Sequence, residues 1–116
     1  MPYLSIETNV AVPTAQRDAL LAAASQQVSA ALGKAEDYVM VALHDQTPMR
    51  FAGQTGPCAF MQLASLDLSD DQCPELAAIL CDFVGKYLDI PANRSYIQFA
   101  DATRARWGWN HRTFAG

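Results

Sequence analysis

The sequence predicts an α+β fold in which two duplicated β-α-β units form one four-stranded mixed sheet, with both helices on one face. Three observations support this fold: a length of 116 residues that suits one domain, a strand–helix–strand pattern in each half, and a weak repeat at an offset of 56 residues. Apolar helix positions of the first half recur in the second, with Leu20, Val28 and Leu32 matching Leu76, Val84 and Leu88. The domain therefore spans residues 1–116, with repeat halves at about 2–56 and 57–112; the alternative is chance matching between two amphipathic helices.

The first half reads as a strand, a helix and a second strand. Residues 3–10 largely alternate apolar and polar side chains, which is typical of a half-buried strand. Thr14 is expected to cap a helix whose apolar stripe continues until Gly33 ends it. Residues 38–43 form a largely apolar strand, and the turn-rich residues 44–57 join the two halves.

The second half repeats this plan. Residues 58–68 form a long β-type run, and Ser69 with Gln72 matches a capping box at the start of a helix. The helix has the cleanest apolar periodicity of the chain, at Leu76, Ile79, Leu80, Phe83, Val84, Tyr87 and Leu88. Pro91 is expected to close this helix, and residues 95–100 form the last long strand.

Composition excludes several classes of function. The net charge of −4, from 8 basic and 12 acidic residues, argues against nucleic acid as a partner. No apolar run is long enough to cross a membrane, and residues 1–10 carry Glu7 and no basic segment, so we expect a cytoplasmic protein without a signal peptide. Cys58, Cys73 and Cys81 form no CxxC pair, which favours reduced thiols.

Several features predict self-association. Charged residues make up 17% of the chain, below the ~25% usual for soluble domains. The strand runs 38–43 and 58–66 are apolar on both phases, which is typical of strands buried on both faces. A symmetric oligomer would cover the sheet face that lacks helices. The aromatic tail, with Trp107 and Trp109, either contacts a partner or folds back on its own subunit.

Pro2 is the most informative residue for function. Methionine aminopeptidases usually remove Met1 before a small residue, and removal would leave a proline with a free secondary amine. An α-amino group titrates near ~7.7–8.0, and burial or a nearby cation lowers that pKa. Such an amine can act as a general base near neutral pH. The alternative is an inert proline at the first position of a strand.

Five short motifs occur in order along the chain. They are PYLSIETNV at 2–10, LGK at 32–34, PCA at 57–59, Tyr96-Ile97, and GWN at 108–110 followed by TFA at 113–115. In this order and spacing the chain resembles the macrophage migration inhibitory factor family of the tautomerase superfamily, as a bacterial-type homologue. The resemblance extends from one end of the chain to the other.

The resemblance implies a homotrimer with a central barrel of sheets and active sites between neighbouring subunits. It implies a keto–enol tautomerase of the phenylpyruvate tautomerase or dopachrome isomerase type, acting on a 2-keto acid or enol without metal or organic cofactor. Pro2 would be the catalytic base. The alternative is a cytokine-like protein that binds a protein receptor through its trimer surface, with vestigial catalysis and release by a non-classical route.

Further site residues follow from the resemblance. Lys34 would hold the substrate carboxylate and lower the pKa of the proline amine, although a solvated lysine at a helix end is the alternative. Tyr96 of the neighbouring subunit would donate its hydroxyl to the enolate oxygen; alternatively it is a core tyrosine. Leu66 would contact the substrate through its backbone, and Trp109 and Phe114 would wall the pocket.

Some positions depart from the family pattern. Gln98 stands in place of the pocket asparagine and adds one methylene, and Trp107 replaces a smaller aliphatic residue. Met61 occupies the position that would complete a CxxC with Cys58, which argues against thiol oxidoreductase activity. The arginines at 104 and 106 could help to bind a carboxylate, or could be solvated surface residues.

Overall fold

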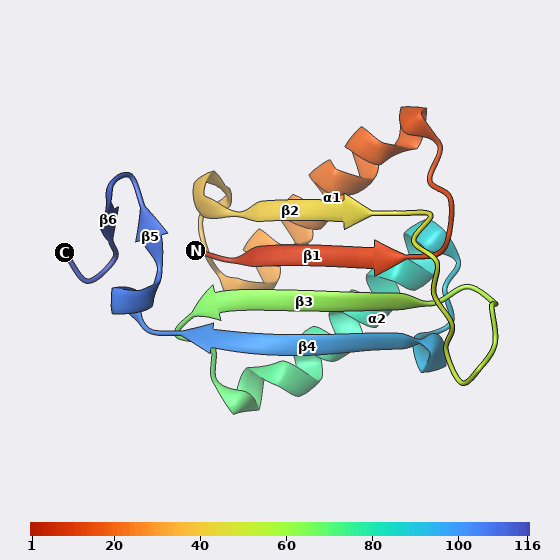
Figure 1. The fold of residues 1–116 in the computed structure, drawn as a ribbon. Helices are drawn as coiled ribbons and strands as arrows, with labels where there is room; N and C mark the ends of the chain where they lie inside the picture. Colours follow the sequence, from red (N-terminus) through yellow and green to blue (C-terminus); the bar gives the residue numbers. More distant parts are fainter.

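The computed structural model describes residues 1–116 and contains one four-stranded sheet in the order β2-β1-β3-β4 (Figure 1). The strands are β1 (Tyr3–Thr8), β2 (Met40–His44), β3 (Ala59–Leu66) and β4 (Ser95–Ala102). β1 pairs in parallel with β2 and antiparallel with β3, and β3 pairs in parallel with β4. The helices α1 (Thr14–Leu32) and α2 (Cys73–Leu88) cover one face of the sheet (Figure 1). The predicted mixed α+β fold is therefore confirmed.

The core lies between the sheet and the two helices. Leu4 and Ile6 of β1 pair with Leu63 and Met61 of β3, and all four side chains are almost completely buried. The helices contribute the buried residues Leu20, Ala24, Val28, Leu76, Leu80, Phe83, Val84 and Leu88. Burying one such aliphatic side chain stabilises a fold by about 1.5–3 kcal/mol. This packing fixes which face of each strand turns away from the helices.

α1 begins and ends at sharp turns. Thr14 is the first helical residue and Pro13 occupies the capping position without a side-chain bond, so the prediction of Thr14 as the cap is wrong. Pro13 has the extended backbone that precedes a helix, and proline presets that geometry through its ring. Gly33 ends the helix with a left-handed φ of 62°, as predicted. This turn brings Lys34 back toward the sheet.

α2 is preceded by a capping box and ended by an aspartate. Ser69 and Gln72 form the predicted box around a single 3₁₀ turn, Asp70–Gln72, directly before the helix. Asp89 ends α2 in the left-handed conformation, with φ of 56°. The prediction that Pro91 closes the helix is therefore wrong, because Asp89 turns the chain first and short acidic side chains tolerate this conformation. Pro91 instead precedes the 3₁₀ turn Ala92–Arg94.

The loop that joins the halves lies at the end of the sheet where β1 and β2 finish (Figure 1). The Arg94 guanidinium donates to backbone carbonyls of this loop, at Phe51, Gln54, Gly56 and Pro57, over 2.9–3.2 Å. The Asn9 amide donates to Thr55 and Gly56 and accepts from the Cys58 N–H. These bonds order a loop that has almost no secondary structure of its own.

The C-terminal tail forms the hairpin β5 (Gly108–Trp109) and β6 (Arg112–Thr113), beside the N-terminus in Figure 1. Trp109 and Phe114 stack with 5.7 Å between ring centroids, and both meet the edge of Tyr38. The tail thus contacts its own chain, although Trp109 is still 46% exposed.

β2 differs from the expected strand in extent and in burial. It starts at Met40, because Tyr38 belongs to the 3₁₀ turn Glu36–Tyr38. Burial of β2 on both faces does not occur within one chain, since Met40 is 66% exposed and no helix covers the second sheet face. Neither helix of the chain is long and apolar enough for a membrane crossing.

Candidate active site

A small cavity of about 170 Å³ opens where β1 begins. Its walls are Met1, Asp37, Tyr38, Val39, Met40, Trp107, Trp109 and Phe114. Pro2 is buried directly behind Met1, and its carbonyl accepts a hydrogen bond from the Met40 N–H at 3.0 Å. Removal of Met1 would leave the Pro2 nitrogen as the end of the chain at this cavity. The structure thus places two predicted aromatic residues, Trp109 and Phe114, at the same cavity as Met1, the residue before the predicted base.

Lys34 and Leu66 are in direct contact. The Lys34 ammonium donates to the Leu66 carbonyl oxygen at 2.7 Å. Tyr3 pairs with Ala64 in the antiparallel register, so continuing the register by two residues places Leu66 beside Met1. Lys34 is half-buried at the end of α1, and its bond to the end of β3 holds a positive charge near the chain terminus. Two of the predicted site residues therefore contact each other near the chain terminus.

The N-terminal amine has an altered acidity. Burial lowers the pKa of this amine below its ordinary value of 8.0, and the positive charges of Lys34 and Arg104 lower it further. The negative charge of Asp67 acts in the opposite direction. The amine in the structure belongs to Met1, and the same charges would surround the Pro2 amine one residue further along. A larger fraction of such an amine is neutral at pH 7, as a general base requires.

Tyr96 and Gln98 lie elsewhere in the chain. Through the register of β3, Tyr96 stands level with Glu7 and Gln98 with Ser5, whereas the predicted base precedes Tyr3. Four residues along a strand separate Tyr96 from Tyr3 by about 13 Å. Both side chains project from the sheet face without helices, Tyr96 at 64% exposure. One chain therefore does not bring these two residues to the amine.

Other residues at the cavity were not singled out in the sequence. Tyr38 and Met40 line the cavity, but the apolar run around them indicated only a strand. Asp67 gave no sequence signal, and its ion pair with Arg104, at 3.0 Å, depends on a contact across 37 positions. The sequence does offer Arg104 as a carboxylate-binding residue, because Arg104 precedes the aromatic residues of the tail. The chain contains no group of three His, Cys, Asp or Glu side chains that could hold a metal ion.

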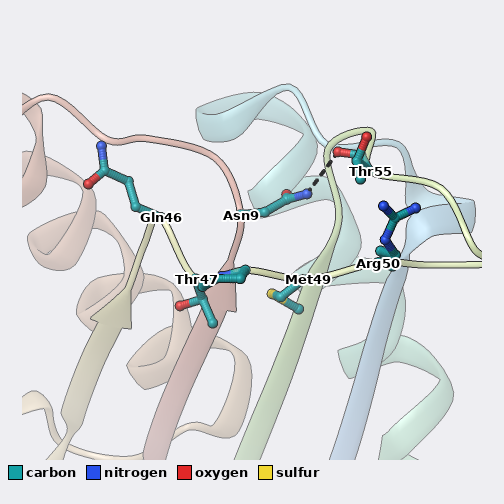
Figure 2. A pocket seen from close by; sticks show the side chains of 7 residues that line it. Asn9, Gln46, Thr47, Met49, Arg50 and Thr55 are labelled. Atoms are coloured by element: carbon teal, nitrogen blue, oxygen red, sulfur yellow. Dashed lines mark hydrogen bonds between the residues drawn. The ribbon is translucent and has the colours of Figure 1, made fainter.

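A second, larger pocket lies at the opposite end of the sheet. It has a volume of about 730 Å³ and is lined by Asn9, Gln46, Thr47, Pro48, Met49, Arg50 and Thr55 (Figure 2). Asn9 points to the Thr55 carbonyl in Figure 2 and is occupied with loop bonds. None of the predicted site residues lines this pocket, and its titratable group is a single arginine. The smaller cavity, by contrast, contains the chain terminus and two of the predicted site residues, Trp109 and Phe114.

The domain belongs to the class built from two fused β-α-β units. In this chain the N-terminus lies at a cavity between the sheet and an aromatic tail. The family model described as "Macrophage migration inhibitory factor (MIF)" matches residues 1–115. The chain belongs to the macrophage migration inhibitory factor family, a family of the tautomerase superfamily.

Similar proteins come from distant organisms. The chain is 37% identical over 116 residues to the macrophage migration inhibitory factor of Xenopus laevis, covering 99% of this chain and 100% of that protein. A crystal structure of the homologue from Prochlorococcus marinus matches with a TM-score of 0.91 at 34% identity, over 97% of this chain and 98% of that one. The Toxoplasma gondii structure matches with a TM-score of 0.88 at 38% identity, over 97% and 99%.

Proposed function

We propose that this protein is a cofactor-free keto–enol tautomerase that acts on 2-keto acids of the phenylpyruvate type, with the Pro2 amine as the base. The observation that carries the proposal is a chain terminus at a cavity with aromatic walls, where burial and the charge of Lys34 lower the pKa of the terminal amine, that of Met1 in this structure. Membership of the macrophage migration inhibitory factor family supports it.

The chemistry requires one proton to move. The neutral Pro2 nitrogen takes a proton from the carbon next to the keto group, and the electron pair of that C–H bond forms the C=C bond. The carbonyl oxygen becomes an enolate oxygen and then accepts a proton, so keto and enol forms interconvert without net oxidation. Lys34 holds the substrate carboxylate, and the aromatic rings of Trp109 and Phe114 contact the substrate ring.

The proposed active form is a homotrimer in which Tyr96 and Gln98 come from a neighbouring subunit. Their distance from the amine of their own chain and their exposure on the uncovered sheet face support this arrangement. The Tyr96 hydroxyl donates a hydrogen bond to the enolate oxygen, which stabilises the charge that develops there. Gln98 supplies an amide donor from the same face, and Leu66 contributes its backbone carbonyl through Lys34.

The decisive variant is Pro2→Gly, compared with wild type in a phenylpyruvate tautomerase assay. Intact mass must first confirm that Met1 is absent from both proteins. Turnover is expected to fall by roughly 10²–10⁴-fold, as is typical when a general base is lost. Pro48→Gly, in the exposed loop at the other end of the sheet, controls for the loss of a proline. Equal turnover of wild type and Pro2→Gly would refute Pro2 as the base.

A further inference from the structure

Two cations contact consecutive residues at the end of β3. The Lys34 ammonium donates to the Leu66 carbonyl at 2.7 Å, and the Arg104 guanidinium donates to the Asp67 carboxylate at 3.0 Å. Lys34 comes from the end of α1, and Arg104 begins the 3₁₀ turn Arg104–Arg106 that leads into the tail. Two separate segments therefore bring positive charge to one turn.

Hydrogen bonds and strand pairing fix the backbone of the turn at Asp67. Asp67 has a left-handed φ of 58°, and the next N–H, of Leu68, donates to the Asp101 carboxylate at 3.1 Å. Leu66 is buried, at 1% exposure, and pairs with Ala102 of β4. The backbone at Asp67 is thus held by the sheet, and the Asp67 carboxylate in turn bonds Arg104.

Arg104 has unused hydrogen-bonding capacity. A guanidinium has five N–H donors, and a single contact of Arg104, through Nη2, joins it to Asp67. The side chains of Arg104 and Asp67 are 57% and 66% exposed, so the other donors face solvent. A guanidinium is well suited to bind a second carboxylate through two parallel bonds. Lys34 also has spare donors, because only one of its three N–H groups bonds Leu66.

Three charged side chains act on the N-terminal amine, which is that of Met1 in this structure. Lys34 and Arg104 both lower the pKa of that amine and Asp67 raises it, so all three lie within electrostatic reach of it. Arg106, two residues beyond Arg104, is exposed and forms no ion pair. The difference between the two arginines singles out Arg104.

We propose that Arg104, oriented by Asp67, is a second substrate-binding cation that contacts the carboxylate of a 2-keto acid together with Lys34. It makes the site favour free acids over their neutral esters. This inference rests on the proposed function, because it assigns a residue to the same site. The competing interpretation is a structural tether, in which the ion pair only fastens the tail to the sheet.

The acidity of the amine tests, without any turnover, whether both charges lie near it; the comparison of acid and ester substrates separates a substrate contact from a tether. Arg104→Gln removes a cation and should raise the pKa of the Pro2 amine, whereas Asp67→Asn removes an anion and should lower it. An unchanged pKa in both variants would place these charges away from the amine and would overturn the inference. The measurement is the pH dependence of acylation of the N-terminal amine, followed by mass spectrometry. Arg106→Gln is the matched control, and Asp37 at the cavity is unchanged throughout.

Substrate preference supplies the second readout. Arg104→Gln should raise KM for phenylpyruvate roughly tenfold, the loss expected for a partly exposed charge-assisted hydrogen bond, and should leave KM for the methyl ester unchanged. Arg104→Lys should recover part of the loss. An equal change for acid and ester would overturn the inference.

Binding keeps this inference separate from the proposed function. Phenylpyruvate binding can be followed by tryptophan fluorescence, because Trp107 and Trp109 line the cavity. Binding that depends on Arg104 in a protein without turnover would refute the tautomerase and support the second cation. Turnover that depends on Pro2, with phenylpyruvate binding unaffected by Arg104→Gln, would refute the second cation alone.

Discussion

The two ends of the sheet differ in how their polar groups are used. At the end where β1 begins, the side chains of Lys34 and Arg104 each make one contact, to Leu66 and Asp67 at the end of β3, and retain free donors. At the other end, Arg94 and Asn9 direct their donors to backbone carbonyls of the connecting loop. One end has donors available for a ligand, and the other end uses its donors to hold the chain.

The residues of the proposed site are divided between these two ends. Tyr96 belongs to the well-held end, which is the end that Arg94 and Asn9 order. The centroids of the Tyr96 and Phe51 rings are 4.9 Å apart, and the Arg94 guanidinium carbon lies 5.3 Å from the Phe51 centroid. The predicted base, Pro2, belongs to the open end, about 16 Å away along the strands, because it lies five residues from the level of Tyr96. In the proposed function each chain would carry two half-sites, and the trimer would join the open end of one chain to the well-held end of another.

The largest effect is expected when two inactive variants are mixed in one trimer. Pro2→Gly and Tyr96→Ala each remove one half-site, so each trimer alone should be at least roughly 10²-fold less active. Random co-assembly should restore about a quarter of the wild-type activity, because one interface in four combines two intact halves in a symmetric ring. The assay follows phenylpyruvate turnover after joint refolding, with variants refolded separately and mixed as the control. Absence of any recovery would place both groups in one chain.

A second prediction concerns the well-held end. Arg94→Met removes the bonds to four loop carbonyls and should lower the free energy of unfolding by about 1–3 kcal/mol. Chemical denaturation measures this value. Arg50→Met is the matched control, since Arg50 donates one exposed bond, to Gly53 at 2.9 Å, and its loss should have little effect. Equal destabilisation by the two variants would mean that the Arg94 contacts do not order the loop.

A smaller effect is expected from Asp45, at the same end. Its carboxylate accepts the Val12 N–H at 2.9 Å and the Arg17 guanidinium at 3.1 Å, and the Val12 bond is the main cause that lowers the pKa of Asp45 below 3.8. The folded-state pKa is depressed, so the stabilisation is present above the unfolded value and is lost as pH falls through the folded value.

Asp45→Asn should therefore lower Tm at pH 7, and the difference from wild type should shrink as pH falls below about 3.9. Thermal unfolding across pH, with Asp18→Asn on the exposed face of α1 as the control, provides the measurement. A difference in Tm that is constant with pH would show that the charge of Asp45 is not responsible.

The sequence allowed the fold to be predicted because its signals are local. Helical periodicity, the capping box at Ser69 and the left-handed Gly33 act within a few residues, and the structure contains each of them. The local predictions that were wrong, at Thr14 and Pro91, concern the residue at which a helix begins or ends. There a neighbouring residue, Pro13 or Asp89, adopts the required backbone first.

By itself, the sequence determined the two β-α-β units, the apolar faces that pack together, and a proline that could become the chain terminus. Tertiary structure decided which charges surround that terminus. The contacts of Lys34 with Leu66 and of Arg104 with Asp67 join residues 32 and 37 positions apart. No local pattern encodes such contacts, because they depend on strand register and on the path of the tail. For the same reason, only the folded sheet placed Tyr96 and Gln98 away from the amine of their own chain.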